Sequence, residues 1–89
     1  MTLPPDAEIK EQVDAKGLLC PEPVMLLHKA VKRVGADSMI KMIATDPSSE
    51  RDVARFCEFL RHELVDFEKE SADGELLFTY WIKTRPDEA

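Results

Sequence analysis

The pattern of hydrophobic and polar positions changes its period several times along the chain. Ile9, Glu11 and Val13 alternate with Lys10, Gln12 and Asp14, so two of the three positions on one face are apolar, which favours a strand. From Val24 to Val34 the apolar residues recur at helical spacing, and Gly35 is well placed to end that helix. Residues 38–45, "SMIKMIAT", are a short stretch rich in apolar and β-branched residues. The first half of the chain therefore predicts a strand, a helix and a second strand.

The second half predicts another helix and a hairpin. Asp46 and the serines after it are a helix-start signal, with Asp52 three residues after Ser49 as in a capping box. The apolar stripe expected on this helix consists of Val53, Phe56, Cys57, Leu60 and Leu64. "LVDFEKE" and "ELLFTYWIK" then predict two strands joined around "SADG", whose Asp73-Gly74 pair is typical of a hairpin turn.

The resulting order, β-α-β-α-β-β, predicts an α+β fold. We expect a two-layer sandwich in which a four-stranded mixed sheet carries both helices on one face, because each helix has one apolar stripe to bury. No repeat, linker or low-complexity block divides the chain. We therefore expect a single domain over residues 9–83, with a flexible leader at 1–8 and a flexible tail at 84–89.

Composition and charge narrow the classes of function. An apolar content of 44% with 34% charged residues is typical of a globular chain and not of a disordered one. Twelve basic against eighteen acidic side chains, a net charge of -6, disfavour nucleic-acid binding, which depends on Lys and Arg. The N-terminus lacks the features of a signal peptide, and no apolar run approaches the roughly 20 residues that span a bilayer. We expect a cytoplasmic protein that does not bind membranes, and two cysteines without a disulfide framework agree with that.

The stretch "KGLLCPEP" places a thiol between a glycine turn and two prolines, at the start of the first predicted helix. Pro21 suits the first helical position, and Gly17 permits the turn that presents the sulfur. Unpaired N–H groups and the helix macrodipole at such a position favour the thiolate, so Cys20 is expected to be exposed and nucleophilic. A cysteine at such a junction is often only a small buried residue, but the flanking prolines favour exposure.

The second cysteine and the two histidines predict no further chemistry. Cys57 lies on the apolar stripe and is expected in the core, without a disulfide to Cys20. His28 and His62 are expected at the surface or on a helix flank, and neither has the spacing of a zinc site. His28 lies about two helical turns beyond Cys20, too far to act as its base. We expect neither a metal nor a cofactor.

Residues of both predicted helices could form a docking surface around the thiol. Met25 and Leu26 are expected to point away from the apolar stripe and, with Leu18 and Leu19, to form an apolar collar near Cys20. Basic side chains follow on the same helix, and an aromatic residue lies off the stripe of the second. The predicted docking residues are Met25, Leu26, His28, Lys32, Asp46, Arg51, Asp52 and Phe59. A solvated surface without a partner is the alternative interpretation.

"VDAKGLLCPEPVMLLHKAV" resembles the signature of the TusA (SirA-like) family of small sulfur carrier proteins. The resemblance continues through "ATDPSSERDVARFCEFLRHEL" and covers roughly residues 12–83. It implies the same β-α-β-α-β-β sandwich. The positions that match the family motif around Cys20 are Asp14, Gly17, Leu18, Pro21, Glu22 and Pro23. Asp46, Arg51 and Asp52 match a "DP…RD" stretch that contributes to partner docking in the family, whereas His28 replaces an arginine.

The resemblance also implies a function. Cys20 would accept sulfane sulfur as a persulfide from an IscS-like cysteine desulfurase. It would pass this sulfur to a TusBCD/DsrE-type or rhodanese acceptor, for 2-thiolation of the wobble uridine of tRNA. Such a protein is a carrier in sulfurtransferase chemistry and not a stand-alone enzyme. A monomer that docks transiently is the simplest expectation.

Three alternatives stay open at this point. Family members also serve molybdenum cofactor synthesis or sulfur oxidation. A regulatory or RNA-contacting module is the second alternative, because the fold resembles the C-terminal domain of translation initiation factor three. The third is a thiol redox enzyme, although the chain lacks a C-x-x-C pair.

Overall fold

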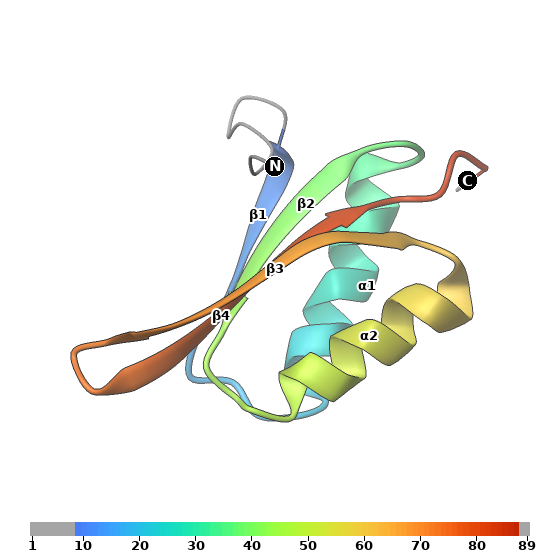
Figure 1. Ribbon diagram of the computed structural model, residues 1–89. Coiled ribbons are helices and arrows are strands. Elements are labelled where there is room, and N and C mark those ends of the chain that lie inside the picture. Colours follow the sequence, from blue (N-terminus) through green and yellow to red (C-terminus); the bar gives the residue numbers. More distant parts are fainter. Residues whose placement is uncertain (1–8, 88–89) are drawn as a thin grey trace.

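The computed structural model describes residues 9–87, which form a four-stranded sheet with two helices on one face (Figure 1). The elements are β1 (Ile9–Ala15), α1 (Glu22–Val34), β2 (Met39–Ala44), α2 (Ser49–Leu60), β3 (Glu63–Ala72) and β4 (Glu75–Lys83). The strand order is β1-β2-β4-β3, with β1 parallel to β2 and the other neighbours antiparallel. The predicted α+β sandwich with a mixed sheet is confirmed.

The core lies between the helices and one face of the sheet. Every second residue of β2 is buried, and so are the residues that face them on β4: Ile40, Met42 and Ala44 pair with Ile82, Tyr80 and Phe78. The buried helical side chains that cover this face are Leu27, Ala30, Val31, Val53, Phe56 and Cys57. The strand period of two and the helical period of 3.6 thus direct their apolar residues to one shared interior.

The start of α2 differs from the prediction. Ser48, not Ser49, occupies the N-cap position, and its side chain makes no cap hydrogen bond. Asp46 does this instead: its Oδ1 accepts the Ser48 N–H at 3.1 Å, and its carbonyl accepts the Ser49 N–H at 2.9 Å. The predicted capping box of Ser49 and Asp52 is therefore wrong, because the aspartate in the preceding turn supplies the acceptor.

The end of α2 also differs. Arg61 adopts the left-handed conformation, with φ 63°, and its N–H donates to the Cys57 carbonyl. The helix therefore stops at Leu60. Leu64, predicted on the helical stripe, belongs to β3, where it packs against the core from the sheet.

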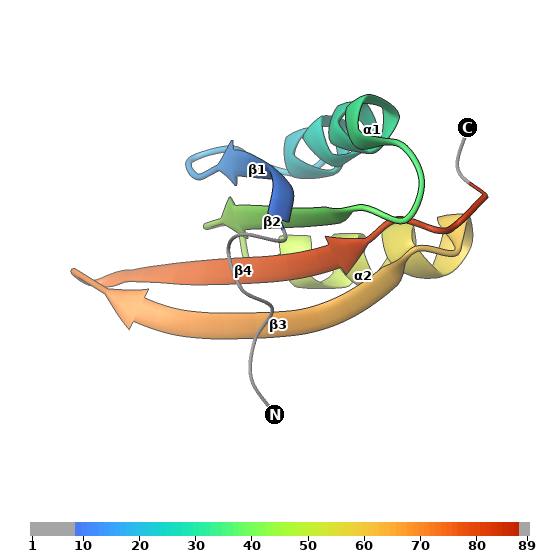
Figure 2. The ribbon, with the colours of Figure 1, turned by 90° about the horizontal axis from the view of Figure 1, so that it is seen from above.

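The hairpin of β3 and β4 extends past the other two strands (Figures 1 and 2). Asp73 and Gly74 connect its strands with φ values of 54° and 78°. Positive φ at both central residues is the requirement of a type I′ turn, so the predicted hairpin is confirmed.

Backbone pairing continues past β4. Thr84 is buried, its N–H donates to the Ser38 carbonyl at 2.8 Å, and its hydroxyl donates to the Gly35 carbonyl at 2.6 Å. These bonds anchor the first residue of the segment predicted as the tail. The predicted leader, residues 1–8, and residues 88–89 lie outside the described residues. Neither helix of the described part is long and apolar enough to cross a membrane.

Candidate functional site

Cys20 is exposed in the connection between β1 and α1. The helix begins at Glu22, with Pro21 in the N-cap position and Pro23 in the first turn. Pro21 has φ −100° and ψ 16°, and its peptide bond to Cys20 is cis. The prediction that Pro21 is the first helical residue is therefore wrong, although its carbonyl already accepts the Met25 N–H at 3.1 Å. The thiol thus precedes the helix by two residues.

Two hydrogen bonds tie the loop of Cys20 to the connection between β2 and α2. Gly17, at φ 81°, donates its N–H to Thr45 Oγ1 at 2.9 Å. Cys20 donates its N–H to Asp46 Oδ2 at 2.8 Å, and the same oxygen accepts the Ser48 hydroxyl at 2.7 Å. Asp46 therefore holds the backbone of the thiol residue and the start of α2 at once.

The loop itself has a local support. Asp14 Oδ1 accepts the Lys16 N–H at 3.1 Å, which forms a turn directly after β1. Glu22 donates its N–H to the Leu19 carbonyl at 2.9 Å. Of the predicted motif residues, Asp14 and Gly17 thus shape the loop, Glu22 is exposed, and Pro23 is buried under the first turn.

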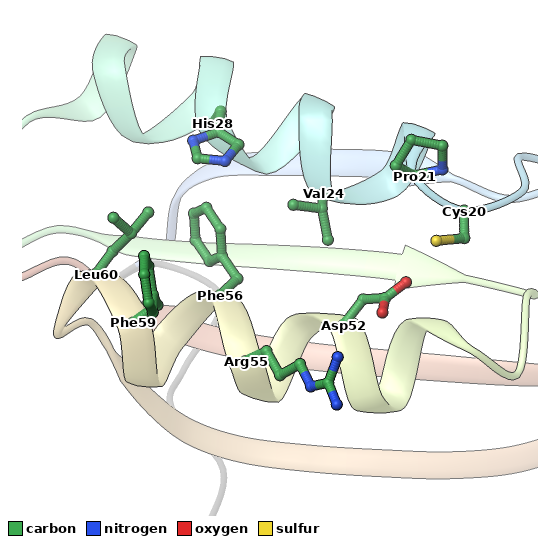
Figure 3. Close-up of a pocket in the computed structure, with 9 residues that line it drawn as sticks. All are labelled: Cys20, Pro21, Val24, His28, Asp52, Arg55, Phe56, Phe59 and Leu60. Atoms are coloured by element: carbon green, nitrogen blue, oxygen red, sulfur yellow. The ribbon is translucent and has the colours of Figure 1, made fainter.

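Cys20 lies at one end of a groove of about 530 Å³ between α1 and α2 (Figure 3). The two helices leave this open channel between them on the same face of the sheet. The residues that line it are Cys20, Pro21, Val24, His28, Asp52, Arg55, Phe56, Phe59 and Leu60. Figure 3 shows the sulfur and the Asp52 carboxylate facing each other across one end of the groove.

The electrostatic environment of Cys20 is the opposite of the predicted one. The Asp52 carboxylate, which hydrogen-bonds the thiol, raises the pKa of Cys20 above its ordinary value. Desolvation and the charges of Asp52 and Asp46 act in the same direction, and only the Ser48 side chain opposes them. The helix start does not lower this pKa because two carboxylates flank the sulfur and both prolines of the motif lack an N–H.

The pKa of Asp46 shifts in the opposite direction to that of Cys20. Hydrogen bonds from the Ser48 hydroxyl and from the N–H groups of Cys20 and Ser48 hold the pKa of the Asp46 carboxyl below its ordinary value. The site therefore keeps a fixed negative charge beside the thiol at neutral pH.

The structure brings part of the predicted docking set together at the groove. His28, Asp52 and Phe59 line it with Cys20, and Phe59 is 88% exposed. Arg51 is exposed outside the groove, and its Nε lies 3.5 Å from Asp52 Oδ1. Asp46 does not line the groove, but its carboxylate accepts the Cys20 N–H and so holds the loop at this end of the groove.

The remaining docking residues lie apart from the groove lining. Met25 and Leu19 are exposed, but Leu26 and Leu18 are half-buried and pack against the core. The predicted collar of four apolar residues is therefore wrong for two of its members. Lys32 is exposed farther along α1, outside the groove lining.

Val24, Arg55, Phe56 and Leu60 line the groove, although the sequence predicted no role for them in the site. A signal for three of them exists, because the α2 residues of the lining, Asp52, Arg55, Phe56, Phe59 and Leu60, repeat at helical spacing. This stripe overlaps the core stripe at Phe56 and Leu60. One α2 surface thus serves both the interior and the groove.

The Phe56 ring contacts both histidines. Its ring makes an edge contact with His28, at 4.8 Å between centroids, and stacks on His62 at 5.5 Å. His62 is only 7% exposed, and its Nδ1 accepts the Arg85 N–H at 3.1 Å. His62 therefore flanks the end of α2, which is one of the two predicted positions, but it is buried and not at the surface.

Cys57 is buried, as predicted, and both cysteines are free. Burial raises the pKa of the Cys57 thiol to about 11, so it stays protonated. Among residues 9–87, no group of three or more His, Cys, Asp or Glu side chains is placed to hold a metal ion. Of the two thiols, both among the described residues, Cys20 is thus the accessible one.

Comparison with known proteins agrees with this picture. Residues 11–83 match the family described as sulfurtransferase TusA. The sulfur carrier protein TusA of Pseudomonas savastanoi pv. phaseolicola is 51% identical over 75 residues, 84% of this chain and 84% of its own length. The protein of the same name from Pseudomonas paraeruginosa is 46% identical over 87 residues, 98% of this chain and 100% of its own.

A solved structure shares the fold. The SirA-like protein from Desulfitobacterium hafniense has a TM-score of 0.60 and 23% identity, over 80% of this chain and 95% of that chain. From the family match and the identities over most of its length, the chain belongs to the TusA family.

Proposed function

We propose that this chain is a sulfur carrier that holds one sulfane sulfur as a persulfide on Cys20. The observation that supports this most is the exposed thiol at the end of an open groove, on a loop held by Asp46. Relatives that are 46–51% identical over most of the chain are named sulfur carrier proteins. Burial of Cys57 argues against a dithiol redox enzyme.

Loading is a displacement at sulfur. The Cys20 thiolate attacks the terminal sulfur of a persulfide on the donor, a cysteine desulfurase. The donor's S–S bond breaks, its electron pair stays on the donor cysteine, and the terminal sulfur becomes bonded to Cys20 Sγ. One S–S bond forms as another breaks, so no external oxidant or reductant is needed. The donor thiolate takes up the proton that Cys20 has lost.

Delivery repeats this step with the roles exchanged. A thiolate of a TusBCD/DsrE-type or rhodanese acceptor attacks the terminal sulfur, and Cys20 leaves as the thiolate. We propose that the sulfur then serves 2-thiouridine formation at the tRNA wobble position. Because transfer ends on a protein, the carrier needs no contact with RNA, and a net charge of -6 is compatible with that. We propose a cytoplasmic monomer that docks transiently.

The groove is the proposed docking site for both partners. Its apolar floor at Phe56 and Leu60 and the exposed ring of Phe59 provide contact area beside the thiol. Asp52 and Arg51 add charges of both signs at the same end. A partner loop in the groove would bring its persulfide to Cys20 without a deep pocket.

The test is a two-step relay with purified proteins. The carrier is incubated with a cysteine desulfurase, pyridoxal phosphate and free cysteine, and its intact mass is measured before and after a downstream acceptor is added. We expect a gain of one sulfur that dithiothreitol reverses and that moves to the acceptor. Cys20→Ser is the control and should gain none. A wild-type chain that takes no sulfur from desulfurases or from a rhodanese with thiosulfate would contradict the carrier function.

A further inference from the structure

We propose that Arg55 is a specificity residue for the sulfur donor: its guanidinium pairs with a carboxylate in the extended donor segment that brings a persulfide to Cys20. This inference rests on the proposed carrier function. It goes beyond that function because it states which chemistry the segment in the groove has, and where its charge lies relative to the persulfide.

Charged and apolar side chains are unevenly distributed along the groove. The thiol end has two carboxylates, Asp52 in the lining and Asp46 in the connection before α2. The far end is apolar, with Leu60 and the exposed ring of Phe59. Arg55 lies between these ends on α2, and Figure 3 shows its guanidinium directed toward the Asp52 end. From the thiol outward, the α2 side of the groove is therefore acidic, then basic, then apolar.

The positive charge of Arg55 is available to a partner. Arg55 is exposed, and among residues 9–87 its side chain makes no ion pair or hydrogen bond. Asp52 already has a cationic neighbour in Arg51, at 3.5 Å. The α1 side of the lining, from Pro21 to His28, contributes no carboxylate. A carboxylate on a docked segment would therefore complement Arg55, and the loss of water from the filled groove would strengthen the pair.

Helix geometry converts this order into a spacing. At about 1.5 Å per residue, Arg55 lies about 4.5 Å and Phe59 about 10.5 Å beyond Asp52 along the α2 axis. An extended chain advances about 3.3 Å per residue. A segment whose persulfide meets Cys20 thus brings its first or second residue beyond the cysteine to Arg55 and its third to Phe59. The groove fits a carboxylate at the nearer position and an apolar side chain at the farther one.

The first test uses short peptides and needs no persulfide. Each peptide carries its cysteine as a mixed disulfide with thionitrobenzoate. Cys20 attacks the peptide sulfur, the coloured thionitrobenzoate anion leaves with the electron pair of the broken S–S bond, and a disulfide between the peptide and Cys20 forms. The pairs are Cys-Glu-Ala-Leu against Cys-Lys-Ala-Leu, and Leu-Ala-Glu-Cys against Leu-Ala-Lys-Cys, because the groove accepts either chain direction. The rate ratio within a pair is measured, so any change in the reactivity of Cys20 itself cancels.

We expect the ratio of Glu-peptide to Lys-peptide rates to fall several-fold in Arg55→Gln and further in Arg55→Glu, in at least one chain direction. Added salt should reduce these differences, because it screens an exposed pair. Lys10→Gln is the control: it removes the same charge from an exposed β1 residue outside the groove lining, and its ratios should match the wild type. Equal ratios for wild type and Arg55→Glu in both directions would overturn the proposal.

The second test uses a protein donor. Initial rates of sulfur loading from a cysteine desulfurase supplied with cysteine are measured against carrier concentration. We expect Arg55→Gln to raise the apparent KM several-fold with little change in kcat, Arg55→Lys to recover part of the loss, and Lys10→Gln to behave as the wild type. An unchanged KM in Arg55→Gln would overturn the role of Arg55 toward the donor. If the wild type takes no sulfur at all, the carrier function fails, whereas the peptide ratios still decide whether Arg55 binds a carboxylate beside Cys20.

Discussion

The two cysteines of this chain have opposite environments. Cys20 is exposed on a loop held by hydrogen bonds, whereas Cys57 is 4% exposed in the core with a pKa raised to about 11. Thiol chemistry requires access and a thiolate, so only the first can exchange sulfur in the folded state. The role of each cysteine can be separated by substitution.

Cys57→Ala should still load sulfur but lose about 1–2 kcal/mol of unfolding free energy, because the smaller side chain leaves a cavity in the core. Cys20→Ser should keep the unfolding free energy and lose all loading. Urea unfolding and intact mass after desulfurase treatment measure the two properties. Loss of loading in Cys57→Ala with retention in Cys20→Ser would contradict the assignment.

Asp46 links the acid stability of the fold to the site. Its pKa is lowered in the folded state, so its stabilising contribution is fully present above the ordinary carboxyl pKa and is lost as the pH falls through the lowered value. Asp46→Ala should therefore lower the melting temperature at neutral pH, and the difference from wild type should shrink on acidification. Thermal unfolding from neutral to strongly acidic pH checks this. A difference that stays constant with pH would show that the charged form is not what matters.

At the scale of single residues, the sequence predicted the exposure of Cys20 but not the sign of its pKa shift. Flanking prolines and a glycine turn are local signals, and they were sufficient for exposure. Asp52, which dominates the pKa, is remote in sequence and reaches the sulfur only when α2 packs beside α1. Rules for helix ends consider neighbours along the chain, so they do not detect this carboxylate.

At the scale of elements, α2 is joined to the sheet by a buried polar contact. The Ser49 and Tyr80 hydroxyls lie 2.7 Å apart, and both residues are almost fully buried. A hydroxyl left without a partner in such a place costs free energy. This bond fixes the first turn of α2, and therefore Asp52, against β4.

Tyr80→Phe should destabilise the fold by about 1–3 kcal/mol, because it leaves the Ser49 hydroxyl buried without its partner. The double variant Ser49→Ala/Tyr80→Phe should be less destabilised than the sum of the two single variants. Denaturant unfolding of all four proteins completes the cycle. Strict additivity would contradict a coupled hydrogen bond.

The order of the elements and the hairpin could be predicted from the sequence, because periodicity and the Asp73-Gly74 turn are strong local signals. The end of α2 could not. Leu60 and Leu64 keep helical spacing across the true boundary, and Arg61 ends the helix in a left-handed conformation that non-glycine residues seldom adopt. The pattern therefore predicted a helix that was one turn too long.

At the scale of the whole molecule, the groove exists because two helices lie on the same face of one sheet and leave space between them (Figure 3). Its residues come from separate parts of the chain. The sequence predicted the two helices and their common face, but the gap depends on side-chain packing between them. That is why Phe59 was predicted as exposed without its groove neighbours.

Phe59→Ala should change the unfolding free energy by no more than about 0.5 kcal/mol, because the ring is 88% exposed. It should slow loading from a cysteine desulfurase several-fold while loading from glutathione persulfide is unaffected. Leu76→Ala, an exposed residue beside the β3–β4 turn, is the matched control and should change neither rate. Equal desulfurase rates for wild type and Phe59→Ala would exclude the groove as the docking site.

The central claim is that Cys20 carries sulfur as a persulfide. The most direct measurement is to load the wild-type chain with a desulfurase and cysteine, trap it at once with iodoacetamide, and map the trapped sulfur by peptide mass. We predict an additional sulfur between Cys20 and the alkyl group, and an unmodified Cys57. Additional sulfur on Cys57, or a Cys20 alkylated only as the simple thiol, would contradict the account.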